Sequence, residues 1–311
     1  MEEFDIAIIG GGVTGLGAAV YAARFNMKTI VFGGRLGGLI QDTHLVENYP
    51  GFKRLTGYEL FQNLLEHAKD YSNLVDIKEE FVKDVKKLKE GFEVIGEKSK
   101  IKAKTILFAT GTRRKKLDVP GEKEFNSKGI SYCATCDSVL FRNKVCIMVG
   151  GSDSAAKEAL LLSEYAKKVY IVYRKEKIHP EPINMKRVEE KIKEGKIEII
   201  NNTNITEIKG DKFVTSVIFD KPYKGNKEFK CEGVFIEIGH LVESELAKKL
   251  GVKLDNKNEI IIDRDSKTNV DGIYAAGDVA ARDWKQAIVG VAEGVIATNS
   301  AYEYIQEQKV K

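Results

Sequence analysis

Two cysteines separated by two residues form the most informative chemical pattern in this sequence. Cys133 and Cys136 lie in the segment Ser-Tyr-Cys-Ala-Thr-Cys-Asp. Cysteines at this spacing either close a redox-active disulfide or supply half of a zinc site. A zinc site needs a second pair, and the other two cysteines, Cys146 and Cys231, are not spaced as one. We therefore favour a redox dithiol and expect Cys146, in an apolar run, to pack in the core.

An acidic residue follows the second cysteine directly. The carboxylate of Asp137 is placed to exchange a proton with a thiol, as a general acid or base does. The alternative is that Asp137 caps the N-terminus of the next helix. The candidate catalytic residues are therefore Cys133, Cys136 and Asp137.

A glycine-rich loop near the N-terminus predicts a dinucleotide site. Gly10, Gly12 and Gly15 match the G-x-G-x-x-G pattern directly after an apolar strand and at the start of an Ala-rich helix. These glycines allow a tight turn, a close pyrophosphate and close packing of the helix on the strand. The acid that usually ends the second strand is absent, and a flexible loop at 33–39 stands in its place.

A second loop of this type begins at Gly150, with Ser152 in the place of the middle glycine. Arg174 and Lys175 follow the next strand, where basic side chains suit a ribose 2′-phosphate and so favour NADPH over NADH. Because Ser152 carries a β-carbon that restricts the approach of a pyrophosphate, a decayed site kept as a scaffold is the alternative.

The elements that must position these residues follow an alternating strand and helix pattern. We expect strands at 4–9, 29–32, 105–109, 145–149 and 169–173, and helices at 16–25, 60–71 and 155–162. Short strands are expected at 197–208, 214–219, 233–238, 260–263 and 272–275, and a final helix at 287–305. The basic run 113–116 before Pro120-Gly121 indicates a linker rather than a binding patch. The pattern thus predicts an α/β fold with two nucleotide-binding units.

Length and composition exclude several other classes of protein. The 311 residues suit two domains, and 43% hydrophobic content is enough for a large core. The 50 basic and 46 acidic residues are well mixed, so we expect neither nucleic acid nor a membrane surface as a partner. Four cysteines exclude a secreted disulfide scaffold, and the acidic N-terminus does not resemble a secretory signal. The expected location is the cytoplasm.

Six segments together resemble the low-molecular-weight thioredoxin reductases over essentially the whole chain. They are the loops at 10–15 and 150–155, Glu-Asn-Tyr-Pro-Gly at 47–51, Ala-Thr-Gly at 109–111, Cys-Ala-Thr-Cys-Asp at 133–137 and Tyr-Ala-Ala-Gly-Asp-Val at 274–279. The resemblance implies two Rossmann-like three-layer domains. These are an FAD domain formed by 1–114 and 243–311, and an inserted NADPH domain at 115–242 that carries the disulfide. It also implies a homodimer and hinges at 113–120 and 238–245.

The resemblance also implies which residues bind the cofactors. The implied FAD contacts are Gly10, Gly12, Thr14, Gly15, Gly34, Arg35, Gly37, Gly38, Leu39, Asn48, Val82, Ala109, Thr110, Gly111, Gly277, Asp278, Lys285, Gln286 and Ala287. The expected NADPH contacts are Gly150, Ser152, Asp153, Ser154, Arg174, Lys175 and His179. The family usually has His-Arg-Arg and a later Arg where this chain has Tyr173-Arg174-Lys175 and His179, so this chain departs from the family pattern at the site of the electron donor.

The implied activity is thioredoxin-disulfide reduction. By resemblance, Cys136 faces the flavin, and Cys133 is the outer thiol that attacks the disulfide of a thioredoxin-like protein. We also expect a helix N-terminus after Cys136 to lower the pKa of a thiol. The alternatives are a thioredoxin reductase that takes electrons from reduced ferredoxin, with a relic nucleotide site, and a flavoprotein that reduces ferredoxin, which would not need the two cysteines. A non-enzymatic nucleotide- or zinc-binding scaffold predicts a colourless protein.

Overall fold

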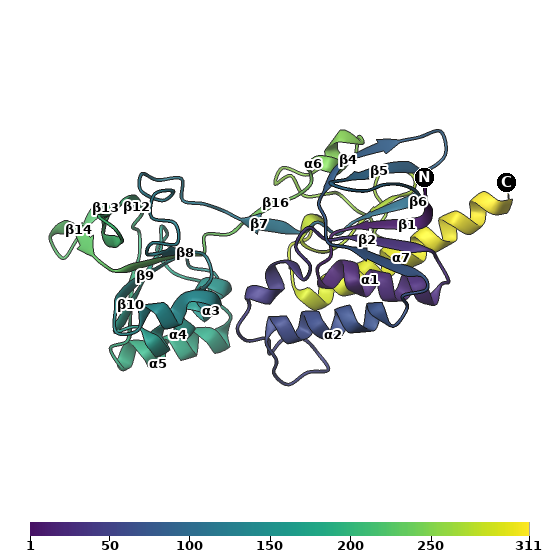
Figure 1. Cartoon of the computed structure of the whole chain (residues 1–311). Coiled ribbons are helices and arrows are strands. Elements are labelled where there is room, and N and C mark those ends of the chain that lie inside the picture. Colours follow the sequence, from purple (N-terminus) through teal and green to yellow (C-terminus); the bar gives the residue numbers. More distant parts are fainter. Residues whose placement is uncertain (311) are drawn as a thin grey trace. The chain divides into compact units, whose positions relative to one another are not determined.

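The chain folds into two compact units. The computed structural model describes residues 1–310. One unit, called the first unit below, contains residues 1–113 and the chain from Val242 onward; the other, the inserted unit, is Arg114–Leu241. The chain passes between them twice, through β7 (Thr112–Arg114) and β16 (His240–Val242), which pair as a two-stranded sheet (Figure 1).

A parallel sheet forms the centre of the first unit. Its order is β3-β2-β1-β6, and β6 also pairs with β17 and with an antiparallel β5-β4 extension. The bounds are β1 (Glu3–Ile9), β2 (Thr29–Phe32), β3 (Val75–Lys78), β4 (Val82–Lys87), β5 (Phe92–Gly96), β6 (Lys100–Phe108) and β17 (Ile273–Ala275). Because β1 and β6 are parallel neighbours, with Ile9 opposite Phe108, the loops that follow them meet at one edge of the sheet.

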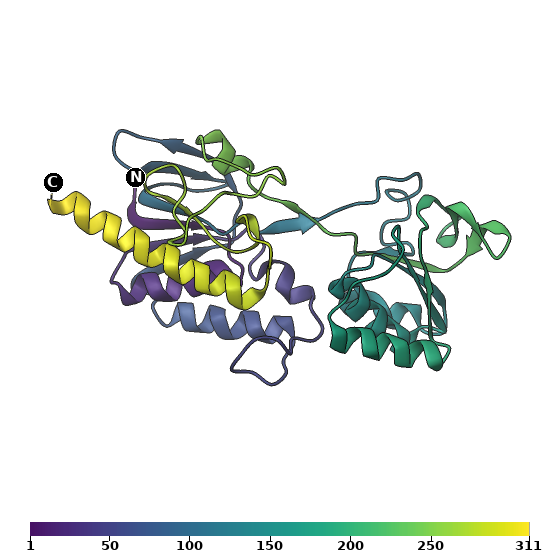
Figure 2. The ribbon, with the colours of Figure 1, turned by 180° about the vertical axis from the view of Figure 1, so that it is seen from behind.

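Three helices cover one face of this sheet: α1 (Val13–Arg24), α2 (Gly57–Lys69) and α7 (Ala287–Val310) (Figure 2). Small alanines on α1 allow it to pack closely on α7. A capping box fixes the start of α2, where the Glu59 amide donates to Thr56 Oγ1 and the Thr56 amide donates to the Glu59 carboxylate. The opposite face packs on β4, β5 and α6 (Glu245–Lys249), which completes three layers.

The inserted unit repeats this plan. Its parallel sheet has the order β11-β10-β9-β15-β8. Helices α3 (Ala134–Asp137), α4 (Asp153–Tyr165) and α5 (Pro182–Lys193) pack on one face, and an antiparallel sheet, β12-β13-β14, covers the other. The strand bounds are β8 (Ile130–Ser131), β9 (Val145–Val149), β10 (Lys168–Val172), β11 (Ile197–Ile200), β12 (Ile205–Gly210), β13 (Val214–Tyr223), β14 (Asn226–Lys230) and β15 (Gly233–Ile236).

The expected fold class is confirmed, but one local prediction is wrong. Residues 260–263 do not form a strand, because Ile260 makes only isolated bridges with Leu254 and Ala280. A short 3-10 helix, Ser138–Phe141, follows Cys136, and a further helical turn, α3, begins at Ala134 with Cys133 as its N-cap. Cys146 is fully buried in β9, as expected.

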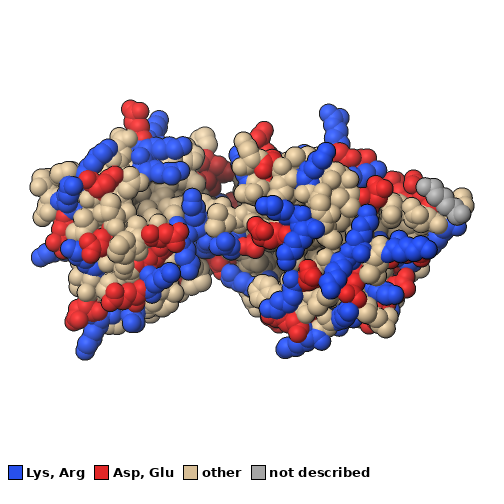
Figure 3. Space-filling model, turned by 90° about the horizontal axis from the view of Figure 1, so that it is seen from above, with Lys and Arg blue, Asp and Glu red and all other residues tan. Residues whose placement is uncertain are grey.

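The surface mixes both signs of charge. Basic and acidic side chains intermingle over each unit on the face shown in Figure 3. This distribution matches the nearly balanced composition of 50 basic and 46 acidic residues. No helix among residues 1–310 combines the length and apolar character needed to span a bilayer.

Candidate active and cofactor sites

The first glycine-rich loop connects β1 to α1 beside the end of β6. Gly10 has φ +128°, and a Cβ there would collide with the carbonyl of Ala109. Gly12 is the N-cap of α1 and has no side chain to bond the first-turn amides. Those amides are therefore available to an anion at the helix N-terminus.

A second loop of the first unit lies against this turn. The Gly37 amide donates to the Gly11 carbonyl at 2.8 Å, and Gly12 and Gly37 form an isolated bridge. Gly38 and Leu39 begin the 3-10 helix η1 (Gly38–Asp42). The predicted residues of the 33–39 loop are thus brought next to the first glycine-rich loop.

Two other residues of the 33–39 loop, Gly34 and Arg35, also contact neighbouring side chains. Arg35 forms an ion pair with Asp42, and Gly34 lies under the ring of Phe81. Phe81 precedes Val82 at the start of β4, so the chain before Val82 lies against the 33–39 loop.

The end of β6 and the start of α7 supply further predicted residues. Thr110 Oγ1 donates to the Glu243 carbonyl at 2.6 Å, and Gly111 has φ +65°. Asn48 Nδ2 donates to Gln286 Oε1 at 3.0 Å, which joins two segments far apart in the sequence. Gln286 precedes Ala287, the first residue of α7.

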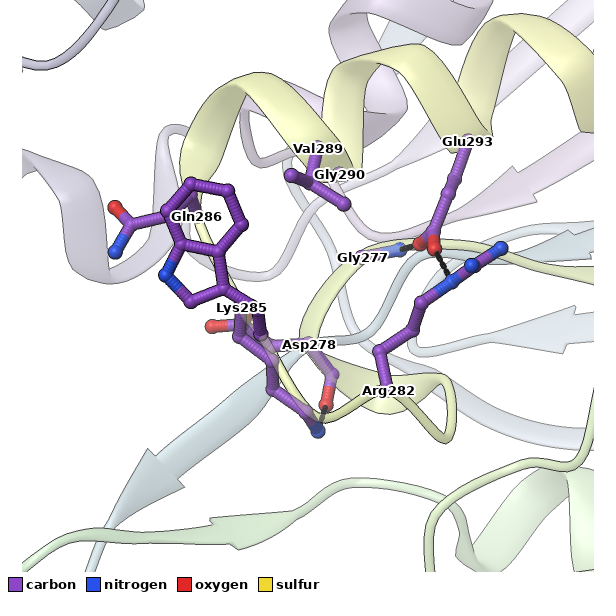
Figure 4. Close-up of a pocket in the computed structure, with 9 residues that line it drawn as sticks. Gly277, Asp278, Arg282, Lys285, Gln286, Val289, Gly290 and Glu293 are labelled. Carbon is purple, nitrogen blue, oxygen red and sulfur yellow. Dashed lines mark hydrogen bonds and ion pairs between the residues drawn. The ribbon is translucent and has the colours of Figure 1, made fainter.

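A pocket is present where the 3-10 helix η3 (Gly277–Val279) faces the start of α7 (Figure 4). Its lining residues are Gly277, Asp278, Arg282, Trp284, Lys285, Gln286, Val289, Gly290 and Glu293. Lys285 Nζ bonds Glu259 Oε1 and the Asp278 carbonyl, both at 2.7 Å. The Asp278 residue is exposed, so its carboxylate is available to hydroxyl groups of a ligand. The sequence did not single out Arg282, Trp284 or Glu293.

In the inserted unit, Cys133 and Cys136 form a disulfide. Cys133 is half-buried and Cys136 is exposed. The Cys136 amide donates to Cys133 Sγ at 3.1 Å, because Cys133 caps the short helix α3. A thiolate at Cys133 in the reduced protein would accept the same hydrogen bond, which favours ionisation of this sulfur.

The Asp137 side chain is held close to this disulfide. Ser131 Oγ donates to Asp137 Oδ2 at 2.6 Å and accepts the Cys133 amide at 3.0 Å. Asp137 caps η2 (Ser138–Phe141) only through its backbone position, since its side chain makes no cap bond there. The Asp137 side chain therefore does not act as a helix cap. Sequence reasoning missed Ser131, because a serine two residues before a cysteine is not a distinctive signal.

A separate set of hydrogen bonds holds Tyr132, the residue before Cys133. Glu122 is only 2% exposed, and its carboxylate accepts the Tyr132 hydroxyl at 2.6 Å and the amides of Leu117 and Asp118. Burial raises the pKa of the Tyr132 hydroxyl, and its hydrogen bond to Glu122 raises it further. Through Glu122, Tyr132 is thereby connected by hydrogen bonds to residues 117 and 118, which follow β7.

The second glycine-rich loop differs from the first in the cap of the helix that follows it. Gly150 repeats the turn of Gly10, with φ +144° against the Glu237 carbonyl. Ser152, however, caps α4 with its own side chain, which accepts the Ala155 amide at 3.4 Å. Asp153 Oδ1 accepts the Glu181 amide and Asn184 Nδ2 at 2.9 and 2.8 Å.

The residues after β10 also fold over this loop. A Cβ on Gly151 would lie 2.6 Å from the ring of Tyr173, whose hydroxyl lies 3.2 Å from His179 Nδ1. The His179 amide donates to the Gly151 carbonyl at 2.8 Å. Ser154, Arg174 and Lys175 are exposed. A nucleotide at this loop must therefore fit beside Tyr173 and compete with the Ser152 cap.

The chain is similar to known proteins along nearly its whole length. Residues 4–294 match the model of the pyridine nucleotide-disulphide oxidoreductase family. The sequence is 38% identical over 319 residues to a thioredoxin reductase of Peptoclostridium acidaminophilum, and 97% of each chain is covered.

Two solved structures are also similar. The thioredoxin reductase of Lactococcus lactis in its FR conformation has a TM-score of 0.91 and 36% identity, with 98% of this chain and 99% of that chain covered. The thioredoxin reductase of T. acidophilum has a TM-score of 0.90 and 37% identity, with 97% and 99% covered.

Proposed function

The chain belongs to the thioredoxin reductases of the pyridine nucleotide-disulphide oxidoreductase family, and we propose that its Cys133–Cys136 disulfide passes electrons from FAD to a thioredoxin-like protein. The observation that carries the proposal is this disulfide, formed in a chain that aligns with thioredoxin reductases over at least 97% of its length. Proteins of this family use FAD and NADPH.

The residues of the first unit fit FAD. The uncapped N-terminus of α1 supplies amides for a pyrophosphate, and the glycines at 37 and 38 leave room beside them. We propose that Asp278 offers its carboxylate to ribityl hydroxyls. Lys285, Gln286 and Asn48, which hydrogen bonds hold in this region, are the proposed neighbours of the isoalloxazine ring. The bound cofactor would supply a two-electron carrier that reduces the disulfide. The inserted unit would bind NADPH.

The thiol chemistry follows from the two cysteines. The Cys133 thiolate attacks the disulfide of thioredoxin, which forms a mixed disulfide and releases one thioredoxin thiolate. Cys136 then attacks Cys133 Sγ, which releases reduced thioredoxin and restores the Cys133–Cys136 disulfide. The Asp137 carboxyl donates a proton to the departing thiolate and takes a proton from the attacking thiol. Two thiols are oxidised and one disulfide is reduced in each cycle.

A single preparation tests the function. The purified protein is expected to be yellow with one FAD per chain and to reduce thioredoxin with NADPH. A protein that is colourless and does not take up added FAD would contradict the proposal. Light scattering on the same sample tests the proposed homodimer. A mass near 34.7 kDa, that of one chain, would contradict it. The proposed location is the cytoplasm, where thioredoxins are kept reduced.

Reduced ferredoxin is a second candidate for the electron donor. It is favoured by the Ser152 side-chain cap, which occupies the Ala155 amide at the second loop. Comparing flavin reduction by NADPH, NADH and reduced ferredoxin distinguishes the donors. In either case we propose that the inserted unit turns about residues 113–120 and 238–245, so that the cysteines meet flavin and thioredoxin in turn.

A further inference from the structure

The pocket beside η3 contains a buried acidic side chain. The Glu293 side chain, on α7, is only 4% exposed. Its Oε2 accepts the Gly277 amide at 2.9 Å, and its Oε1 is paired with the Nε of Arg282 (Figure 4). Arg282 precedes α7 and is 39% exposed at its side chain.

Glu293 lies close to the elements of the proposed FAD site. A Cβ on Gly277 would lie 2.6 Å from Thr14 Oγ1, and one on Gly290 would lie 2.5 Å from the same atom. Thr14 belongs to the first glycine-rich loop, so this loop, η3 and α7 meet at one point. The Glu293 carboxylate, bonded to Gly277, is therefore next to the site where an FAD pyrophosphate is expected.

FAD brings two further negative charges to this site. A buried carboxylate that loses its cation repels them, because the surroundings screen charges poorly. Lys285, the other cation lining the pocket, is already bonded to Glu259 and to the Asp278 carbonyl. The cation that neutralises Glu293 is thus Arg282.

We propose that Arg282 is an FAD-affinity residue that acts by neutralising Glu293, rather than by contacting the cofactor itself. The proposal rests on FAD binding by the first unit. In this scheme Glu293 orders η3 through the Gly277 amide, and Arg282 cancels the charge that this role introduces. Arg282 is accordingly a positioning residue. Removing the arginine alone must weaken FAD binding, whereas removing both charges must restore it.

Four variants test the scheme by FAD release, measured as the rise of flavin fluorescence when the holoenzyme is diluted. Arg282→Ala is expected to bind FAD about tenfold to a hundredfold more weakly, since it leaves a buried charge unpaired. Glu293→Gln removes the charge, keeps an acceptor for the Gly277 amide and serves as the reference for the double variant. The double variant is expected to return to within about threefold of wild type. Arg24→Ala, at the opposite end of α1, is the matched control.

Each remaining outcome has a defined meaning. A double variant as weak as Arg282→Ala would overturn the scheme, because the arginine would then act on FAD directly. Arg282→Ala that holds FAD as firmly as Arg24→Ala would overturn it too. If Arg282→Ala fails to fold, a folded double variant with full FAD content supports the scheme, and a double variant without FAD refutes it. Wild-type protein that holds no FAD would instead refute the proposed function.

Discussion

Ser131 holds Asp137 by a 2.6 Å hydrogen bond from its hydroxyl to the Asp137 carboxylate. The same hydroxyl accepts the Cys133 amide, so one side chain positions both the carboxylate and the backbone of the outer cysteine. Ser131 is 3% exposed at the end of β8, where the inserted sheet fixes it. The Asp137 carboxylate, which we propose transfers protons, is therefore oriented by a residue of the sheet rather than only by the short helix α3.

Ser131→Ala is expected to slow thioredoxin reduction about tenfold, because Asp137 loses the bond that orients it. Reduction of the flavin by the electron donor should be unchanged, since it does not need Asp137. Stopped-flow measurement of the two half-reactions, together with the pH profile of the second, checks this. Ser163→Ala, which removes a hydroxyl bonded to the Leu160 carbonyl in α4, is the control. Equal slowing of both half-reactions would contradict the positioning role.

The sequence predicts the features that depend on local pattern. Gly10 and Gly150 are recognisable because each follows an apolar strand and precedes a helix. The cysteine pair is recognisable because its spacing is compatible with only a few kinds of chemistry. The Ser131–Asp137 bond and the Arg282–Glu293 pair are not predictable in this way, since they depend on which side chains the fold brings together.

The prediction of a strand at 260–263 failed for a related reason. Three consecutive isoleucines favour a strand by composition, but a strand also needs a neighbour along its length. Ile260 is fully buried and bridges two loops, while Ile261 is 45% exposed. The local pattern could not show that no adjacent strand is available to the segment among the described residues.

The two active-site cysteines are expected to fail differently when replaced. Cys136→Ser leaves Cys133 to attack thioredoxin without a resolving thiol, so a stable mixed disulfide should accumulate on non-reducing gels. In the proposed assignment Cys136 is the thiol that meets the flavin, so the Cys133→Ser variant should show a charge-transfer absorption band. A complex trapped only by the Cys133→Ser variant would reverse the assignment of the two roles.

The other cysteines provide an internal control for that experiment. Burial raises the pKa of Cys231 and of Cys146, so neither forms a thiolate readily at neutral pH. After reduction of the native protein, an alkylating reagent at pH 7 is expected to label Cys133 and Cys136 only. Peptide mapping by mass spectrometry checks this, and rapid labelling of Cys231 would contradict the buried position.

We expect Glu198, in the inserted unit, to contribute to stability in a pH-dependent way. Hydrogen bonds from Lys168, Tyr223 and Lys224 hold the pKa of Glu198 at about 2, below its ordinary value of 4.5. This stabilisation is present above pH 4.5 and is lost as the pH falls through about 2, because the unfolded chain binds the proton first.

Glu198→Gln is therefore expected to lower the melting temperature at pH 7 by about 2–4 °C, which corresponds to roughly 1 kcal/mol. The difference from wild type should shrink as the pH falls from 4.5 towards 2. Glu207→Gln, which removes a looser 3.8 Å pair with Lys209, is the control. A difference that stays constant over this range would show that charge is not the cause.

Ser152→Gly is expected to improve the use of NADPH. The change removes the side chain that occupies the Ala155 amide, so this amide becomes available to the pyrophosphate. We expect the KM for NADPH to fall about threefold to tenfold while kcat stays constant, because the chemistry of the flavin is untouched. Steady-state assays with saturating thioredoxin measure both constants. An unchanged or higher KM would mean that the Ser152 cap does not compete with the nucleotide.

The preference between NADPH and NADH should depend on Arg174. Arg174 is exposed after β10, where a 2′-phosphate is expected, and a charge-assisted contact to phosphate contributes about 1.5–3 kcal/mol. Arg174→Ala should therefore lower kcat/KM for NADPH about tenfold to a hundredfold and leave the value for NADH nearly unchanged. Lys177→Ala removes another exposed cation from the same loop and is the matched control. Equal losses with both nucleotides would show that Arg174 does not read the phosphate. If neither nucleotide reduces the flavin of the wild-type protein but reduced ferredoxin does, ferredoxin is the donor. In that case the second loop no longer binds a nucleotide, and the Ser152 side chain caps the helix in place of a pyrophosphate.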